Sequence, residues 1–310
     1  MCKRGGYPFK KTASFLVALG AALTTVATTA AESSAQKAAP ATKVAYRTTA
    51  TDSASAFRLT ENNELVLSAA PREESADAEA LYGPIAEYLS TVLGKPVVFK
   101  HAGNWGVYQG LMQKGAYDIV FDGPHFNSWR VERAQHNVLV KVPGDHVFVV
   151  VVKKDNDKIR ELKQLAGRSI CAHAPPNLGT LTALNEFDNP VRQPIIVNID
   201  GWKEIYQGML ANKCVASVVP LKIYEKFEKD SGHQAKIVFR GATLPDNAIS
   251  AGPRLNAQDQ EKITRALLSP EGEKVTAKLR EKYAGNKAFS AANNKEFAGL
   301  GTYLKNEWGY

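Results

Sequence analysis

Short apolar runs alternate with longer amphipathic segments along the chain from residue 65 onward. Apolar runs bounded by Gly, Pro, Asp or Asn are typical of buried strands, whereas apolar residues spaced three and four apart are typical of helices. Strands are predicted at residues 65–69, 97–100, 117–121, 138–142, 146–152, 169–172, 194–197, 215–219 and 237–240. Helices are predicted at residues 81–92, 108–114, 125–134, 159–165, 223–227, 261–268, 271–283 and 296–304.

Local signals refine these bounds. Pro84 fits the first turn of a helix better than its interior, which puts the start of the first helix near Gly83. Gly94 ends that helix, and Pro96 prevents its continuation. The run at 146–152 is almost entirely apolar, so we expect this strand to be buried on both faces of its sheet.

Residues 96–122 and 194–220 carry the same pattern. The two segments align without a gap, and Tyr108 falls on Tyr206, each followed by Gln and Gly. Because each copy reads strand, loop, helix and strand, we interpret the pair as an internal repeat.

The repeat also extends upstream, where residues 65–71 resemble residues 169–175. The wider spacing in the first copy predicts a longer first helix there. Each half therefore reads β-α-β-α-β, which predicts an α/β protein of two lobes, each a doubly wound, mostly parallel sheet flanked by helices. The chain leaves the first lobe near residue 152 and returns near residue 245, so two crossings form a hinge. The carboxyl ends of the strands should then face a cleft between the lobes, where open α/β sheets bind ligands.

The composition fits two folded lobes. The chain has 310 residues, 44% of them hydrophobic, which is enough for two cores and excludes a disordered chain. The formal net charge is +8, but four of these charges precede the first acidic residue, which leaves +4 for the rest. No cluster of Lys and Arg interleaved with aromatic residues occurs, so the sequence does not indicate a nucleic-acid-binding protein.

The N-terminus has the order of a secretory signal peptide. Basic residues lead into the apolar run at 15–23, and small residues follow at Ala27, Ala30 and Ala31. A membrane anchor is the alternative, but threonines interrupt the run too early to span a bilayer. We therefore predict cleavage near Ala30 or Ala31 and a periplasmic protein. The predicted parts of the chain are a signal peptide at 1–31, a flexible linker at 32–62, the first lobe at 63–150 and 244–310, and the second lobe at 151–243.

Two cysteines remain after the predicted cleavage, Cys171 and Cys214. In an exported protein an even number of cysteines favours a disulfide. The repeat places Cys171 in strand one and Cys214 at the start of strand three, which are neighbours in a sheet ordered 2-1-3. A metal pair and two free thiols are the alternatives. Cys171 and His173 would point to opposite faces of a strand, which argues against a shared metal.

Motifs for catalysis are absent from the sequence. It contains no Gly-x-Ser-x-Gly, no His-Glu-x-x-His, no phosphate-binding loop and no Cys-x-x-Cys. We therefore predict a protein that is not an enzyme and has no metal and no cofactor. An exported hydrolase remains a less favoured alternative.

Several sequence segments resemble those of the phosphate/phosphite/phosphonate-binding (PhnD-like) family of periplasmic solute-binding proteins of ABC transporters. They are Tyr-Gly-Pro-Ile-Ala-Glu-Tyr-Leu-Ser at 82–90, Leu-Gly-Lys-Pro-Val at 93–97, Gly-Ala-Tyr-Asp-Ile-Val-Phe-Asp-Gly-Pro at 115–124 and Leu-Pro at 244–245. The resemblance implies a type II periplasmic binding protein fold, a small anionic solute held between the lobes, and delivery to a permease in the inner membrane by a monomer. A ligand-binding partner of a membrane sensor kinase would share this fold and is an alternative.

The resemblance also implies where the ligand binds. In the family, a Ser/Thr-rich turn at the first helix of the second lobe holds the phosphonate, but residues 174–180 here read Ala-Pro-Pro-Asn-Leu-Gly-Thr. The family's acidic residue after strand three is replaced by Pro220. The predicted ligand-binding residues are Arg72, Trp105, Asp122, Gly123, Pro124, His125, Pro176, Asn177, Leu178, Gly179, Thr180 and Pro220.

Several of these candidates have a simpler structural explanation. Arg72 is also expected as a solvated surface arginine beside two glutamates, and His125 as a helix-capping or buried histidine. Asn177 and Thr180 are suited to cap their own helix. Tyr108 is better explained by packing, because the repeat places Tyr206 at the same position.

Overall fold

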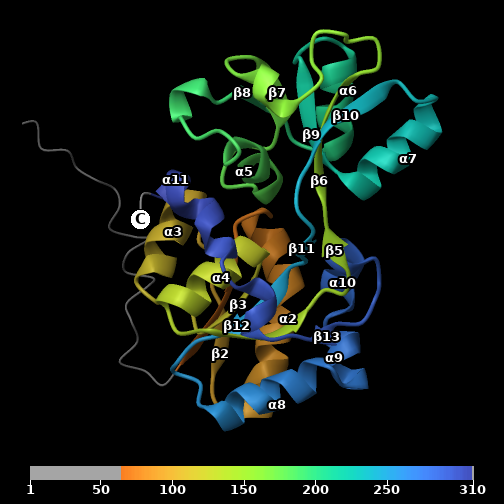
Figure 1. Ribbon diagram of the computed structural model, residues 1–310. Helices are drawn as coiled ribbons and strands as arrows, with labels where there is room; N and C mark the ends of the chain where they lie inside the picture. The colour runs from red at the N-terminus through yellow and green to blue at the C-terminus, as the bar shows by residue number, and fades with distance from the viewer. Residues whose placement is uncertain (1–63, 309–310) are drawn as a thin grey trace, which may run out of the picture. The chain divides into compact units, whose positions relative to one another are not determined.

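A computed structural model describes residues 64–308. The predicted signal peptide and the whole of the predicted linker lie outside the described residues. Within the described part, strands alternate with helices and assemble into two larger sheets and one two-stranded ladder (Figure 1). No strand belongs to both larger sheets.

The first sheet has six strands in the order β13-β4-β12-β3-β1-β2. Its strands are β1 (Leu65–Ala69), β2 (Val97–Phe99), β3 (Ile119–Asp122), β4 (Asn137–Lys141), β12 (Ala248–Ala251) and β13 (Ser290–Ala291). Its helices are α2 (Ser75–Leu93), α3 (Trp105–Gln113), α4 (Pro124–Arg133), α8 (Ala257–Leu267), α9 (Pro270–Val275), α10 (Ala277–Ala284) and α11 (Lys305–Trp308), with 3-10 turns η3 (Asn294–Phe297) and η4 (Leu300–Leu304).

The second sheet has five strands in the order β10-β6-β9-β7-β8. Its strands are β6 (Phe148–Lys153), β7 (Ser169–Ala172), β8 (Ile195–Asn198), β9 (Ala216–Pro220) and β10 (Ala235–Arg240). Its helices are α5 (Leu178–Leu184), α6 (Trp202–Leu210) and α7 (Leu221–Ser231), with 3-10 turns η1 (Leu162–Leu165) and η2 (Pro190–Arg192).

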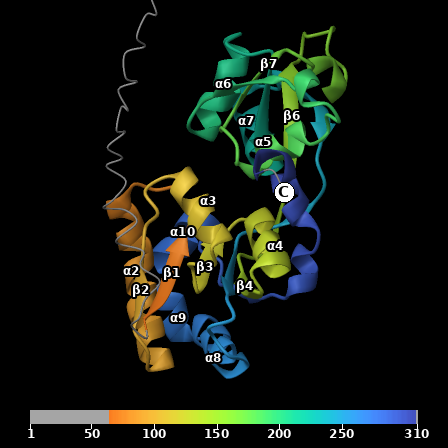
Figure 2. The ribbon, with the colours of Figure 1, turned by 90° about the vertical axis from the view of Figure 1, so that its left-hand side faces the viewer.

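The internal repeat is visible in the strand register. In each sheet the first strand of the repeat lies between the second and the third. The order is β2-β1-β3 in the first sheet (Figure 2) and β8-β7-β9 in the second. All four of these contacts are parallel. Leu65 pairs with Val97 in the first sheet, and their repeat equivalents Ser169 and Ile195 pair in the second. The predicted 2-1-3 order is confirmed, and so is the longer first helix, with 19 residues in α2 and 7 in α5.

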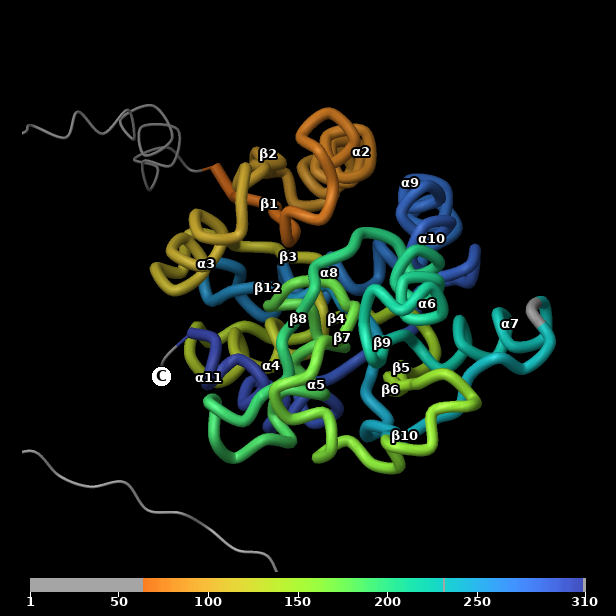
Figure 3. The backbone as a smooth tube through the Cα atoms, turned by 90° about the horizontal axis from the view of Figure 1, so that it is seen from above, coloured from red at the N-terminus to blue at the C-terminus, as the bar shows by residue number. Residues whose placement is uncertain are grey.

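Antiparallel strands come from outside the repeat. The sequence pattern assigned no strand between residues 240 and 261, but β12 forms there, inserts between β3 and β4 and is antiparallel to both (Figure 3). Its four residues, Ala-Ile-Ser-Ala, are all buried, and the apolar strand completes the sheet between two otherwise separated edges. In the second sheet β6 runs antiparallel to β9 and β10.

Strand β6 is buried on both faces, as its apolar run predicted. Phe148, Val150 and Val152 enter one core with α5, whereas Val149 and Val151 enter another with α6. The alternation follows from the two-residue period of a strand. The predicted disulfide is also confirmed, because Cys171 and Cys214 are bonded with a Cα–Cα distance of 5.5 Å.

Four helix predictions required correction, and the first concerns the start of α2. We expected α2 to begin near Gly83, but it begins at Ser75 and contains Pro84. Pro84 is exposed, and the loss of one backbone hydrogen bond is offset by an apolar face that buries Tyr82, Ile85 and Leu89 against the first sheet.

The second correction concerns residues 271–283, which form two helices and not one. The hydroxyl of Thr276 donates to the carbonyl of Gly272 at 2.7 Å, and such back-bonding bends helices. Similarly, residues 159–165 form only the 3-10 turn η1, and residues 296–304 form 3-10 turns.

The chain passes between the two sheets through β5 (Asp145–His146) and β11 (Leu244–Pro245), which pair antiparallel. His146 Nε2 lies 2.8 Å from Asp246 Oδ1 beside this ladder. The crossing that we expected near residue 245 is β11. The other lies at β5 and not near residue 152, because residues 148–153 already form a strand of the second sheet. The bounds that we assigned to the two lobes stay a prediction.

Candidate functional site

A buried network of charges lies at the carboxyl end of β3. Asp122, the last residue of the strand, accepts from Arg72 Nη2 at 2.7 Å and from Arg130 Nη1 at 3.1 Å. The hydroxyl of Tyr108 donates to Asp122 and accepts from Arg130. Asp122 and Arg130 are 0% and 1% exposed at their side chains, whereas Arg72 is 25% exposed. Arg72 is therefore the member of the network that reaches solvent.

Neighbouring elements position these groups. Arg72 follows the end of β1, where its N–H donates to the carbonyl of Ala70 at 2.8 Å. Since β1 and β3 are adjacent parallel strands, their carboxyl ends lie together, and the Arg72 guanidinium reaches Asp122. Helix α4 starts directly after β3, and its first two turns bring His125 and Arg130 to the same strand end.

Gly123 leaves a small space between two of these side chains. A Cβ on this residue would lie 3.1 Å from His125 Nδ1 and 3.5 Å from Arg72 Nη2. Any side chain here would fill the space that the guanidinium and the imidazole share. Within the described residues, His125 Nδ1 is buried and has no hydrogen-bond partner.

His125 connects the first lobe to the second. Its Nε2 donates to the carbonyl of Pro176 at 3.1 Å, which leaves Nδ1 as the acceptor of the neutral ring. Burial lowers the pKa of His125 to about 4, and the nearby guanidinium groups of Arg72 and Arg130 act in the same direction. The ring is therefore neutral at pH 7.

The two arginines and the tyrosine of the network keep their ordinary protonation states. Burial opposes the charged form of Arg130, but Tyr108 and Asp122 outweigh it, so the pKa of Arg130 is raised. Burial also opposes the charged form of Arg72, and Asp122 reverses the effect and raises the pKa of that guanidinium. Burial raises the pKa of the Tyr108 phenol, which therefore stays protonated and donates to Asp122.

The predicted site residues of the second lobe are occupied by local contacts. Asn177 Oδ1 accepts from the N–H groups of Gly179 and Thr180 at 3.0 and 3.4 Å, so it caps α5 as the simpler explanation held. The hydroxyl of Thr180 donates to the carbonyl of His173 at 2.5 Å. A Cβ on Gly179 would lie 2.6 Å from the ring of Phe148, so this ring lies directly on the first turn of α5. Leu178, Gly179 and Thr180 are buried.

Three further predicted residues lie in contacts with neighbouring elements or inside their own elements. Trp105 is half-buried, stacks on Phe126 with a centroid distance of 5.9 Å, and meets the ring of Tyr108 edge-on at 6.1 Å. Pro220 ends β9, where it pairs with Phe148. Pro124 is buried at the first position of α4. The structure thus joins Arg72, Asp122, Gly123 and His125 directly, and links them to Pro176 through one hydrogen bond.

Sequence reasoning missed Arg130 and saw only packing in Tyr108. Tyr108 is fully buried, but its hydroxyl also belongs to the charge network. A signal for Arg130 exists, because it lies in a helical stretch of otherwise buried residues, where an arginine needs a partner. The sequence does not reveal that this partner is the carboxylate at the end of β3.

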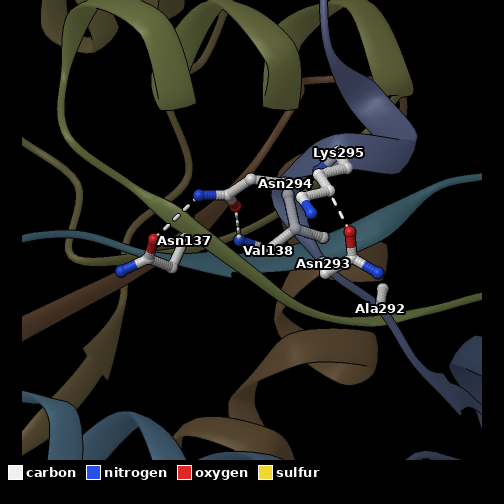
Figure 4. A pocket seen from close by; sticks show the side chains of 6 residues that line it. All are labelled: Asn137, Val138, Ala292, Asn293, Asn294 and Lys295. Atoms are coloured by element: carbon white, nitrogen blue, oxygen red, sulfur yellow. Dashed lines mark hydrogen bonds between the residues drawn. The ribbon is translucent and has the colours of Figure 1, made fainter.

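A surface pocket lies elsewhere, at the junction of β4 and η3 (Figure 4). Its amide groups bind neighbouring backbone and side chains: Asn294 Oδ1 accepts from the Val138 N–H at 2.8 Å, and Asn294 Nδ2 donates to Asn137 at 2.9 Å. None of the predicted site residues lines it. These amides hold the two elements together, and the pocket does not qualify as the ligand site.

Residues 64–308 contain neither a metal-binding group of side chains nor a membrane-spanning helix. No group of three or more His, Cys, Asp or Glu side chains in this part is arranged to hold a metal ion. No helix in the same part is both long and apolar enough to cross a membrane.

The chain is similar to substrate-binding proteins of ABC transporters. The family described as "ABC transporter, phosphonate, periplasmic substrate-binding protein" matches residues 67–297. The phosphate-import protein PhnD of Mycolicibacterium smegmatis is 31% identical over 116 residues, which are 34% of this chain and 36% of that protein. The match thus spans only about a third of that relative's length.

Solved structures with low sequence identity share the fold. A Xanthomonas citri protein bound to ATP has a TM-score of 0.61 at 13% identity, covering 79% of this chain and 98% of that one. PhnD1 of Prochlorococcus marinus in complex with methylphosphonate has a TM-score of 0.56 at 12% identity, with the same coverage. A binding protein component of a Pseudomonas aeruginosa ABC phosphonate transporter has a TM-score of 0.52 at 15% identity, covering 76% and 84%. These similarities show the fold, which is that of type II periplasmic binding proteins.

Proposed function

Because the chain belongs to the phosphonate periplasmic substrate-binding protein family of ABC transporters, we propose that it captures a small anionic solute of the phosphate, phosphite or phosphonate class for import. The family is the one that residues 82–90 and 115–124 resemble, so that prediction is confirmed. This family consists of substrate-binding proteins and not of enzymes.

The excess of positive charge at the end of β3 carries this proposal. Two guanidinium groups, Arg72 and Arg130, share the single carboxylate of Asp122. Both guanidinium groups remain charged, so the network contains two positive charges and only one carboxylate to balance them. An anion beside Arg72 would compensate this charge, and a guanidinium offers paired donors to a planar or tetrahedral oxyanion.

The space over Gly123 supports a protonated oxyanion as the ligand. Arg72 Nη2 is a donor at one side of this space, and His125 Nδ1 is an acceptor without a partner at the other. Phosphate and phosphonate monoanions carry acceptor oxygens and at least one O–H donor. Such an anion would satisfy the guanidinium and the imidazole together.

The ligand-binding residues that we predicted are kept in this proposal with different tasks. Arg72, Gly123 and His125 contact the oxyanion, and Asp122 holds Arg72 in place. The other residues form the walls around the solute: Trp105, Pro124, Pro176, Asn177, Leu178, Gly179, Thr180 and Pro220. Asn177 and Thr180 contribute side chains that are already bonded within α5, so they contribute less to affinity than Arg72.

The proposed partner is a permease in the inner membrane, to which the protein delivers its solute as a monomer. The proposal includes export to the periplasm through the signal peptide predicted at residues 1–31. The matched relative, a phosphate-import protein, supports an oxyanion as the cargo. No observation favours the sensor-kinase partner over the permease.

Isothermal titration calorimetry with phosphate, phosphite and methylphosphonate tests the proposal. For the anion that the wild-type protein binds, we expect Arg72→Gln to lower the affinity at least tenfold, because a charge-assisted contact is lost. Arg254→Gln is the matched control, since Arg254 Nη1 pairs with Asp118 at 3.0 Å, just before the opposite end of β3. Wild-type affinity in Arg72→Gln, or equal losses in both variants, would contradict the proposed site. Turnover of any of these compounds would contradict the proposed class of protein.

A further inference from the structure

Aromatic rings gather at the carboxyl ends of the parallel strands in the second sheet. His173 directly follows β7, Trp202 begins α6 after β8, and Phe148 pairs with Pro220 at the end of β9. The rings of His173 and Trp202 meet edge-on with centroids 4.4 Å apart, and Phe148 lies 6.4 Å from Trp202. We call His173, Trp202 and Phe148 the aromatic edge.

The aromatic edge is only partly buried, although Trp202 also packs against the two cores of the second sheet. Phe148 is a buried core residue that covers the first turn of α5. Trp202 is half-buried, and the side chain of His173 is 25% exposed. These two rings therefore keep accessible surface at the end of the sheet where α/β proteins bind ligands.

The aromatic edge is unsuited to an anion. The first turn of α5 is capped by Asn177, and the carboxylate of Asp200 lies 4.0 Å from His173 Nδ1. Burial lowers the pKa of His173, so the ring is neutral at pH 7. An anionic group would be held at Arg72, while the aromatic edge offers ring faces and apolar surface.

Backbone contacts connect the two regions. Pro176, whose carbonyl accepts from His125, lies three residues after His173 in the same turn. The carbonyl of His173 accepts from Thr180 in the first turn of α5, which fixes the turn. The space over Gly123 and the aromatic edge thus border the same turn, 173–180.

We propose that the solute is a phosphoryl compound with an aromatic or heteroaromatic substituent, held by its oxyanion at Arg72 and by its ring on Trp202 and His173. This inference rests on the proposed function and adds the substituent. Ring-on-ring contact and burial of the ring favour such a ligand over inorganic phosphate and methylphosphonate.

The test compares phosphate, methylphosphonate and phenylphosphonate by calorimetry. Wild-type protein should bind phenylphosphonate roughly 2- to 10-fold more tightly than methylphosphonate, the effect of one aromatic contact. Trp202→Leu should abolish this preference and leave methylphosphonate affinity unchanged, which also shows that the variant is folded. His173→Asn should reduce the preference by a smaller factor.

Tyr224→Leu is the matched control. Tyr224 is a half-buried ring of the same lobe, and its hydroxyl donates to the carbonyl of Ala235, which pairs with the far end of β6. We expect it to keep the preference for phenylphosphonate. Equal affinities for methylphosphonate and phenylphosphonate in the wild type, or an unchanged preference in Trp202→Leu, would overturn this inference and leave the proposed function intact. Failure of all three anions to bind would overturn both.

Discussion

Tyr108 and Tyr206 occupy the same position of the internal repeat and have different chemical surroundings. Both are buried, and both hydroxyls donate to a buried carboxylate. In the first lobe the carboxylate is Asp122, at the end of β3, where Arg72 and Arg130 also converge. In the second lobe it is Glu228, on α7, where it accepts from the N–H of Ala235.

The difference shows how one repeat serves two tasks. The tyrosine and its hydrogen bond belong to the shared fold, because both lobes keep them. The position of the carboxylate differs: at a strand end it pairs with an arginine of the proposed site, whereas on a helix it only joins α6, α7 and β10. The first lobe therefore supplies charge to the proposed site, and the second supplies turns and rings.

The largest expected effect comes from removing each carboxylate. Asp122→Asn leaves the buried guanidinium of Arg130 without a counter-ion, so we expect a loss of about 3–5 kcal/mol in the free energy of unfolding. Glu228→Gln keeps an amide oxygen as acceptor for Tyr206 and leaves no buried arginine without a counter-ion. We therefore expect a loss of only about 1–2 kcal/mol in the free energy of unfolding. Urea unfolding followed by circular dichroism measures both. Equal losses would show that the two carboxylates have the same structural role.

Lowering the pH should destabilise the first lobe through His125. Its pKa is about 4 in the folded protein and 6.5 ordinarily, so between these values only the unfolded chain binds the proton. Stability is therefore complete above pH 6.5 and falls as the pH is lowered towards 4, by about 2 kcal/mol at pH 5. Burial also lowers the pKa of His136, to about 3, which adds a loss of the same sign.

The measurement is urea unfolding at pH 7 and pH 5. In His125→Asn the difference between the two pH values should shrink by about 2 kcal/mol, and His136→Asn should remove a further share. An undiminished difference in both variants would show that neither imidazole is kept neutral by burial.

The smallest expected effect separates two glycines that the repeat aligns, Gly110 in α3 and Gly208 in α6. A Cβ on Gly110 would meet no atom within 4 Å, so Gly110→Ala should stabilise the protein by about 0.5–1 kcal/mol. A Cβ on Gly208 would lie 3.1 Å from Cys171 Sγ and from Ile199 Cδ1, so crowding should cancel that gain. Thermal unfolding of the two variants checks this. A stabilisation of the same size at both positions would mean that the disulfide does not crowd α6.

Several features could be predicted from the sequence because local pattern and chain order carry them. The repeat predicts the 2-1-3 strand order, since equivalent apolar runs follow one another with the same connections. That order places Cys171 beside Cys214 and so predicts the disulfide, which the structure confirms. The phrases at 82–90 and 115–124 indicate the family. The proximity of Arg72 to residues 122–125 could be predicted because the carboxyl ends of neighbouring parallel strands lie close together, whereas their contact with a ligand stays a prediction.

Other features depend on contacts between segments that are far apart in sequence. Pro84 lacks a backbone N–H and so predicts the start of a helix, yet α2 continues through it. Burial of Tyr82, Ile85 and Leu89 on the sheet outweighs the one lost hydrogen bond. Strand β12 is too short to predict alone, and it exists because β3 and β4 leave a gap that it fills. Likewise, nothing local in Arg130 indicates that it shares Asp122 with Arg72. A charge network depends on distances across the fold, and these distances arise only when β1, β3 and α4 have packed together.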